Sequence, residues 1–157
     1  MVESRYVLHG LIAGTVSGLV TGVFVFLTMP SVEEVLETIK QYMGNQTLGE
    51  ELLAKYVSIM LWLSPFITFI FSLILGALFG ALYEYIDKKM EKNILVPALI
   101  TGAILWIILV IPNMVLGASS IKIIINNISA LTYTITLSIL AIMKNPRANQ
   151  EQVLGNG

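Results

Sequence analysis

The chain contains no cysteine and only one histidine, His9, among its 157 residues. The lack of cysteine excludes disulfides, thiolate nucleophiles and cysteine-based metal sites. A single histidine excludes most of the remaining metal-ligand patterns, so we expect no metal and no other cofactor. The sequence also has no HExxH, no GxSxG, no glycine-rich loop after a strand and no serine marked as a partner for His9. We therefore expect a protein that is not an enzyme.

Charge is scarce as well. Only 12% of the residues are charged, against about 25% in soluble domains. The net charge is −1 and no basic stripe is present, which excludes the usual nucleic-acid-binding surfaces. By contrast, 56% of the residues are hydrophobic and the mean hydropathy is +0.83. The chain resembles the small four-helix membrane proteins of prokaryotes in general character, and no motif assigns it to a family.

Four long apolar runs cover residues 6–29, 57–83, 94–116 and 121–143. About 20 residues of helix cross a hydrocarbon core about 30 Å thick, so each run is long enough to span a membrane. The sequence predicts an all-α integral membrane protein with four transmembrane helices in an antiparallel bundle. We expect one domain over residues 1–144 and a polar tail over 145–157. The first run is too long for a signal peptide and lacks a small-residue cleavage site.

A short amphipathic helix is predicted between the first two runs, over residues 31–43. Ser31 and Glu34 have the spacing of a capping box. One face of the helix is apolar and the other is mainly charged, as in helices that lie on a membrane surface. The apolar face consists of Val32, Val35, Leu36, Ile39 and Met43.

The second apolar run belongs to a segment that is longer than a bilayer requires. An unbroken helix from Leu52 to Tyr85 would rise about 50 Å, so we expect it to tilt, to project into water or to bend. Pro65 is the expected bend. Pro112 is expected to kink the end of the third run, before a tight turn over residues 117–120.

The orientation follows from the basic residues on each side of the expected spans. One side carries Arg5, Lys88, Lys89, Lys92, Lys144 and Arg147, and the opposite side carries Lys40, Lys55 and Lys122. The positive-inside rule then predicts that both termini lie in the cytoplasm and that the amphipathic helix lies outside. We expect the membrane to be the plasma membrane. The sequence NQT makes Asn45 a glycosylation acceptor pattern in the expected external loop.

Small residues recur four positions apart in the apolar runs. Because lipid is as apolar as leucine, helices in a bilayer associate by close packing, which small residues permit. The rows are Gly10, Gly14, Gly18 and Gly22 in the first run, Ser72, Gly76 and Gly80 in the second, and Ala98 and Gly102 in the third. If the first two helices are antiparallel, Gly10 lies at the depth of Gly80 and Gly14 at that of Gly76. The glycine row of the first run packs inside the bundle, faces another protomer or subunit, or lines a solute path.

The fourth run contains the most polar groups. Asn126 and Asn127 lie inside it, and Asn113 and Thr134 are expected to join them in a polar cluster. Such groups form interhelical hydrogen bonds or line a path for a small solute. His9 and Glu84 lie near the cytoplasmic ends of the first two helices. They are either ordinary interfacial residues or a pair that relays a proton.

Two functional classes remain open on this evidence. In the first, the protein is a non-catalytic accessory subunit or an oligomerising scaffold in the membrane. In the second, it is a small-solute channel or transporter that acts as a homo-oligomer, and a continuous polar cavity lined by Asn113, Asn126 and Asn127 would favour this class. The expected partners are membrane lipids and either further copies of the chain or other membrane subunits. The absence of an ionisable residue in the middle of a span disfavours ion-coupled transport.

Overall fold

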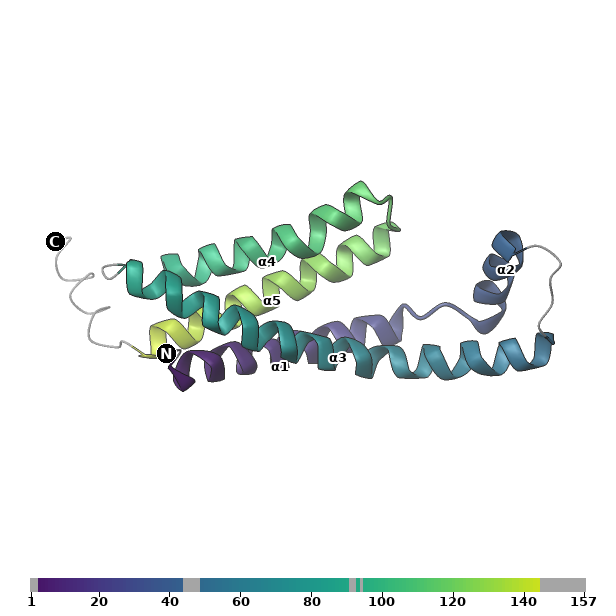
Figure 1. Ribbon diagram of the computed structural model, residues 1–157, viewed down its shortest axis with the longest axis horizontal. Helices are drawn as coiled ribbons and strands as arrows, with labels where there is room; N and C mark the ends of the chain where they lie inside the picture. Colours follow the sequence, from purple (N-terminus) through teal and green to yellow (C-terminus); the bar gives the residue numbers. More distant parts are fainter. Residues whose placement is uncertain (1–2, 44–48, 91–92, 94, 145–157) are drawn as a thin grey trace.

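The computed structural model describes residues 3–43, 49–90, 93 and 95–144. These residues form five helices and no strand (Figure 1). The helices are α1 (Ser4–Leu27), α2 (Val32–Met43), α3 (Glu50–Lys89), α4 (Val96–Val115) and α5 (Ser120–Lys144). The expected glycosylation site at Asn45 and the expected tail over 145–157 lie outside the described residues.

Four of the five helices, α1, α3, α4 and α5, are long and apolar enough to cross a membrane. They coincide with the four runs expected from the sequence, within a few residues at most ends. The largest difference is in α3, which is a single helix of 40 residues. The prediction of an all-helical chain with four potential spans is therefore confirmed.

The helix ends follow from local sequence. At the start of α2, the Glu34 backbone N–H donates to the Ser31 hydroxyl at 3.2 Å, and the Ser31 N–H donates to the Glu34 carboxylate at 3.1 Å. This is the predicted capping box. The end of α4 lies at Val115, beyond Pro112, and Gly117 makes the following turn with a φ of 69°. Residues with a side chain rarely adopt such a φ, which explains glycine at this position.

Pro65 lies inside α3, which continues through it. A proline has no N–H, so it leaves the carbonyl four residues earlier, that of Leu61, without its helical hydrogen bond. The hydroxyl of Ser64 donates to this carbonyl at 2.8 Å. Serine directly before the proline thus supplies a hydrogen bond that an apolar environment would otherwise leave unsatisfied.

Among the helices that the structure describes, α1 and α3 form the most extensive contact, and they run in opposite directions. Gly10 of α1 lies against Gly80, whereas Gly14 lies against Gly76. The helix α5 packs on both α1 and α4. We call the end with the start of α1 and the ends of α3 and α5 the terminal end, and the end with the Gly117 turn the turn end (Figure 1).

Buried aromatic rings fill the half of the molecule nearest the terminal end. Tyr6 and Tyr83 meet edge to face with ring centroids 5.5 Å apart, and Phe79 and Tyr133 do so at 6.3 Å. All four side chains are buried. This half therefore contains the packed core, which also includes Ala13, Ala98, Leu105, Leu137 and Ala141.

The first turns of α3 extend beyond the ends of α1, α4 and α5, and α2 lies beside them (Figure 1). An ion pair joins the two, with the Lys40 ammonium 2.8 Å from the Glu50 carboxylate. At about 1.5 Å per residue, the 40 residues of α3 rise roughly 60 Å, twice the thickness of a hydrocarbon core. The first turns of α3 and the helix α2 thus lie together beyond the ends of the other long helices.

Candidate functional site

The two rows of small residues predicted on the first two spans face each other. A Cβ atom added to Gly14 would lie 2.5 Å from the Ser72 carbonyl oxygen and 3.0 Å from the Gly76 Cα. One added to Gly80 would lie 2.6 Å from the Tyr6 carbonyl oxygen. The obstacles are backbone atoms, which cannot move aside like the tip of a side chain. Glycine here permits backbone contact between α1 and α3.

The row opens toward the turn end. At Gly18 an added Cβ would meet the Ser72 Cβ at 2.9 Å, but at Gly22 its nearest neighbour would be the Pro65 carbonyl oxygen at 3.5 Å, an ordinary contact. The first three glycines of α1 are therefore required by the packing of α1 on α3, and Gly22 is not. Between the two helices the widening leaves an apolar groove, described below.

The third span uses its small residues against α5. A Cβ added to Gly102 would lie 2.6 Å from Cγ2 and 2.7 Å from Cβ of Thr134. The Thr134 hydroxyl itself donates to the Ala130 carbonyl at 2.7 Å within α5. Ala98, one turn before Gly102, is fully buried. Thr134 therefore belongs to the packing contact with α4, some distance along α5 from the asparagines with which it was grouped in the sequence.

The three asparagines take different positions. The side-chain amides of Asn113 and Asn126 both donate to the Leu109 carbonyl, at 2.7 Å and 3.2 Å. Asn127 instead accepts a hydrogen bond of 2.6 Å from the indole N–H of Trp106. The bond from Asn126 and the bond to Asn127 both join α5 to α4, so the amides hold this hairpin together.

A polar cleft lies between the four long helices near the turn end. One part of it has a volume of about 400 Å³. Polar lining residues come from all four helices: Thr21 of α1, Thr68 of α3, Asn113 of α4, and Lys122 and Asn126 of α5. An adjoining cavity of about 340 Å³ shares Lys122 and is lined by Thr28, Ser64 and Ser119 as well. We call the two together the polar cleft.

The polar cleft contains two of the three asparagines expected there, because Asn127 faces Trp106 instead. Lys122 is the one charged residue among those that line it. Thr21 is only 4% exposed, and its hydroxyl has no hydrogen-bond partner among the described residues. Neither Thr21 nor Lys122 was expected at this site from the sequence. Lys122 lies four residues before Asn126 on α5, so the two share one face of that helix, whereas Thr21 is far from Asn126 in the chain and gave no such signal.

The polar cleft narrows toward the middle of the molecule. One helical turn from Thr21 along α1, the hydroxyl of Ser17 donates to the Ser129 carbonyl at 2.9 Å and lies 3.0 Å from the Ser129 hydroxyl. Both serines are buried. The aromatic core lies beyond them, so the cleft opens at the turn end and is closed by packed side chains toward the terminal end.

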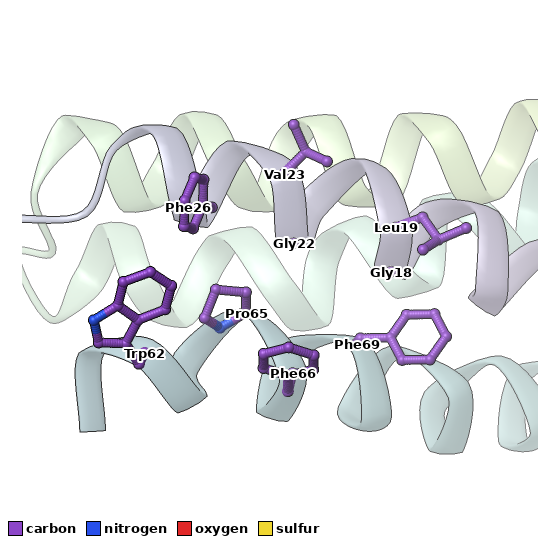
Figure 2. Close-up of a pocket in the computed structure, with 9 residues that line it drawn as sticks. All are labelled: Gly18, Leu19, Gly22, Val23, Phe26, Trp62, Pro65, Phe66 and Phe69. Carbon is purple, nitrogen blue, oxygen red and sulfur yellow. The ribbon is translucent and has the colours of Figure 1, made fainter. Parts of the chain in front are cut away.

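A second depression, the apolar groove, lies between α1 and α3 at the turn end (Figure 2). It has a volume of about 480 Å³. Aromatic side chains of both helices border it, and Gly18 and Gly22 form part of its wall. Its lining residues are Gly18, Leu19, Gly22, Val23, Phe26, Trp62, Pro65, Phe66 and Phe69, none of them charged.

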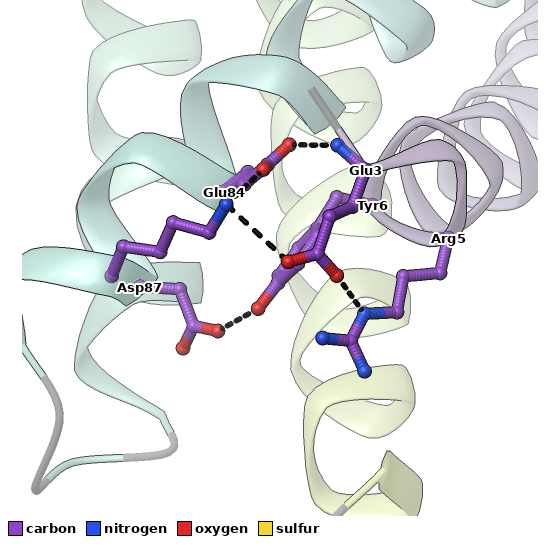
Figure 3. Close-up of polar contacts among 6 residues, drawn as sticks. Glu3, Arg5, Tyr6, Glu84 and Asp87 are labelled. Atoms are coloured by element: carbon purple, nitrogen blue, oxygen red, sulfur yellow. Dashed lines mark hydrogen bonds and ion pairs between the residues drawn. The ribbon is translucent and has the colours of Figure 1, made fainter. Parts of the chain in front are cut away.

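A charged cluster lies at the terminal end (Figure 3). The buried carboxylate of Glu84 accepts a hydrogen bond of 2.8 Å from the Glu3 backbone N–H and pairs with the Lys88 ammonium at 2.5 Å. The Glu3 carboxylate in turn pairs with Arg5 at 2.5 Å and with Lys88 at 3.3 Å. These contacts tie the start of α1 to the last turns of α3.

The charged cluster bears on the expected pair of His9 and Glu84. The described contacts of the Glu84 carboxylate are those with Glu3 and Lys88. Tyr6 extends the cluster, since its hydroxyl donates to the Asp87 carboxylate at 2.6 Å. The Glu84 carboxylate thus joins the start of α1 to the last turns of α3.

Comparison with protein families, with curated protein sequences and with solved structures finds no match to this chain. The polar cleft, the apolar groove and the charged cluster are therefore the features that bear on the function of this chain.

Proposed function

We propose that this chain is a multi-pass plasma-membrane protein without catalytic activity that acts as an accessory subunit or an oligomerising scaffold. Its four long helices form an antiparallel bundle with both termini in the cytoplasm, and α2 lies on the external side. The unequal distribution of lysine and arginine supports this orientation. To test this orientation, single cysteines are introduced into α2 and after Lys89, and intact cells are treated with a membrane-impermeant thiol reagent.

One observation carries the proposal: three hydrogen bonds between polar groups of the apolar helices join one helix to another. Ser17 bonds to Ser129, Asn126 to the Leu109 carbonyl, and Trp106 to Asn127. Intramembrane polar groups that serve chemistry or transport need access to a substrate or an ion. Polar groups that instead form hydrogen bonds between helices support a scaffold.

The outer surface supports the same proposal. Bulky apolar side chains remain exposed along α1 and α3, and the apolar groove indents this surface. In a membrane such a surface contacts lipid or the helices of another protein. Purification from native membranes in mild detergent, followed by native mass spectrometry, tests the proposal. We expect a stoichiometric complex with further copies or other membrane proteins, whereas an isolated monomer would contradict it.

The polar cleft favours a second candidate, a small-solute channel or transporter that acts as a homo-oligomer. Hydroxyl and amide groups from four helices and the ammonium of Lys122 line this cleft. The packed serines and aromatic rings beyond it would have to separate to open a path. Solute flux into liposomes that contain the purified protein, compared with the Lys122→Ala variant, distinguishes this candidate from the scaffold.

A further inference from the structure

On α3, large apolar side chains form a stripe that is exposed in the part of the chain that the structure describes. We call it the α3 stripe. Its members follow one another at intervals of four, three, four, three and four residues. They are Leu52 (54% exposed), Tyr56 (57%), Ile59 (47%), Leu63 (48%), Phe66 (66%) and Ile70 (56%). A three-four repeat of apolar residues is the pattern with which one helix packs along another in a coiled coil.

The stripe carries no charge, and charged residues of α3 lie beside only its first two members, Leu52 and Tyr56. Glu51 and Lys55 lie on the same turns of α3 as Leu52 and Tyr56, but at positions beside the repeat. The helix α2 packs on the same turns, and Val57 there is buried. The projecting part of α3 thus has one face covered by α2 and a second apolar face that is exposed.

Lipid tails do not reach the whole stripe. Leu61 lines the same cavity as Thr28 and Ser119, so these three residues mark the level at which α1 ends and α5 begins. Leu52 precedes Leu61 by nine residues, which places it roughly 13 Å further out along α3. At that distance Leu52 lies beyond the ends of α1 and α5, where it meets lipid headgroups and water and where covering apolar surface is favourable. Within the hydrocarbon this driving force is absent.

We propose that a second copy of this chain covers the α3 stripe, with the two α3 helices parallel and in the same register. Two copies inserted with the same topology are related by a two-fold axis along the membrane normal. Each stripe residue then faces its own counterpart. A symmetric interface of this kind requires a stripe without charge, because any charge on it would meet itself. This inference deepens the scaffold proposal and rests on it.

The neighbouring charges fit this arrangement. In a parallel pair with Tyr56 and Leu63 at the a positions and Leu52 and Ile59 at the d positions, Lys55 is at a g position. It then lies next to Met60 of the partner subunit and not next to its own counterpart. Met60 is 70% exposed in the single chain, so its side chain is available for the stem of this lysine.

The absence of cysteine makes a direct test possible. Single substitutions Leu52→Cys, Tyr56→Cys, Ile59→Cys and Leu63→Cys are introduced into the full chain, which is then oxidised in native membranes. Glu51→Cys and Ser58→Cys serve as matched controls, because each lies one residue before a stripe position and one heptad from the other. We expect disulfide-linked dimers at the stripe positions, at least tenfold above the controls. Equal linkage at all positions, or none at the stripe, overturns the proposal.

A second measurement guards against an effect of the cysteines on folding. Tyr56→Glu places two carboxylates opposite each other at the two-fold axis, so we expect its dimer fraction in liposomes, counted by single-molecule photobleaching, to fall at least tenfold. Glu51→Gln changes charge beside the stripe and leaves this fraction unchanged. A dimer that survives Tyr56→Glu overturns the proposal.

The same preparations separate this inference from the scaffold proposal. If other membrane proteins co-purify in fixed ratio and the stripe positions do not link, the α3 interface is wrong and the scaffold proposal stands. If the stripe positions link and the liposomes conduct a small solute, the interface stands and the scaffold proposal is wrong.

Discussion

The hydroxyl of Ser17 on α1 lies 3.0 Å from the hydroxyl of Ser129 on α5, and it donates to the Ser129 carbonyl at 2.9 Å. These two residues are 112 positions apart in the chain. Their contact joins the first and last spans at the level where the polar cleft ends. A substitution at this contact therefore tests how much it contributes to the stability of the protein.

Substitution of Ser17 by alanine removes this hydrogen bond and leaves the Ser129 hydroxyl without it. We expect the free energy of unfolding to fall by about 0.5–1.5 kcal/mol, the usual net contribution of one hydrogen bond. Thr21→Val is the matched control on the same face, because the Thr21 hydroxyl is buried without a partner among the described residues. We expect this variant to be at least as stable as the parent. Reversible unfolding in mixed micelles measures both changes, and equal destabilisation would contradict the assignment.

The glycines of α1 are predicted to differ in their tolerance of a methyl group. Gly14→Ala drives a Cβ into the Ser72 carbonyl and the Gly76 Cα, so we expect a loss of about 1–3 kcal/mol of stability. Gly22→Ala meets the Pro65 carbonyl at an ordinary 3.5 Å, and alanine is the better helix former. We expect it to raise stability by up to about 1 kcal/mol. Thermal unfolding in detergent, followed by circular dichroism, distinguishes the two.

The contact between Gly102 and Thr134 predicts a rescue. Gly102→Ala alone overlaps the Thr134 side chain and should destabilise α4 against α5. Thr134→Ala alone removes only a few atoms, and in the double variant the new methyl occupies the space that they leave. We expect the double variant to recover at least half of the loss caused by Gly102→Ala. Additive losses in this double-mutant cycle would show that the two residues do not touch.

The charged cluster predicts a dependence of stability on pH. The Arg5 guanidinium hydrogen-bonds the Glu3 carboxylate and, together with Lys88, holds the pKa of Glu3 below its ordinary value of 4.5. A carboxylate whose pKa is lowered by folding stabilises the folded state above the unfolded pKa, and this contribution is lost as the pH falls through the folded pKa. The Glu3→Gln variant keeps the hydrogen bond from the backbone N–H of residue 3 to the Glu84 carboxylate, but its side chain does not titrate.

We therefore expect the parent to exceed Glu3→Gln in stability near neutral pH, and the difference to shrink as the pH falls below 4.5. Unfolding curves of both proteins over this range provide the measurement. A difference that is independent of pH would show that Glu3 acts through packing and not through its charge.

Several features of the fold could be predicted because they depend on neighbours in the sequence. The Ser31 and Glu34 capping box set the start of α2, and the apolar runs set the four long helices. The four-residue spacing of glycines indicated a packing face, since residues at that spacing lie on one side of a helix. The spacing could not show that Gly22 lies where the two helices separate.

The polar cleft was only partly predictable. The asparagines were singled out because amides are rare in apolar helices, and Asn113 and Asn126 do line it. Thr21 carries no such signal, because a threonine in a row of small residues is ordinary. Lys122 lies four residues before Asn126, so its place on the same face of α5 followed from helical spacing. Asn127 was grouped with its neighbour, yet adjacent residues of a helix point about 100° apart and reach different surroundings.

The sequence by itself determined that this protein is helical, that four helices are apolar enough to cross a membrane and that small residues form rows on them. Composition and periodicity are sufficient for these properties because hydrogen bonding within a helix and exclusion of charge from lipid act residue by residue. Tertiary structure alone decided that Ser17 meets Ser129, that Gly22 lies where α1 and α3 separate, and that the α3 stripe remains exposed. These depend on the distances and rotations between whole helices, which lipid, being as apolar as the side chains, does not dictate.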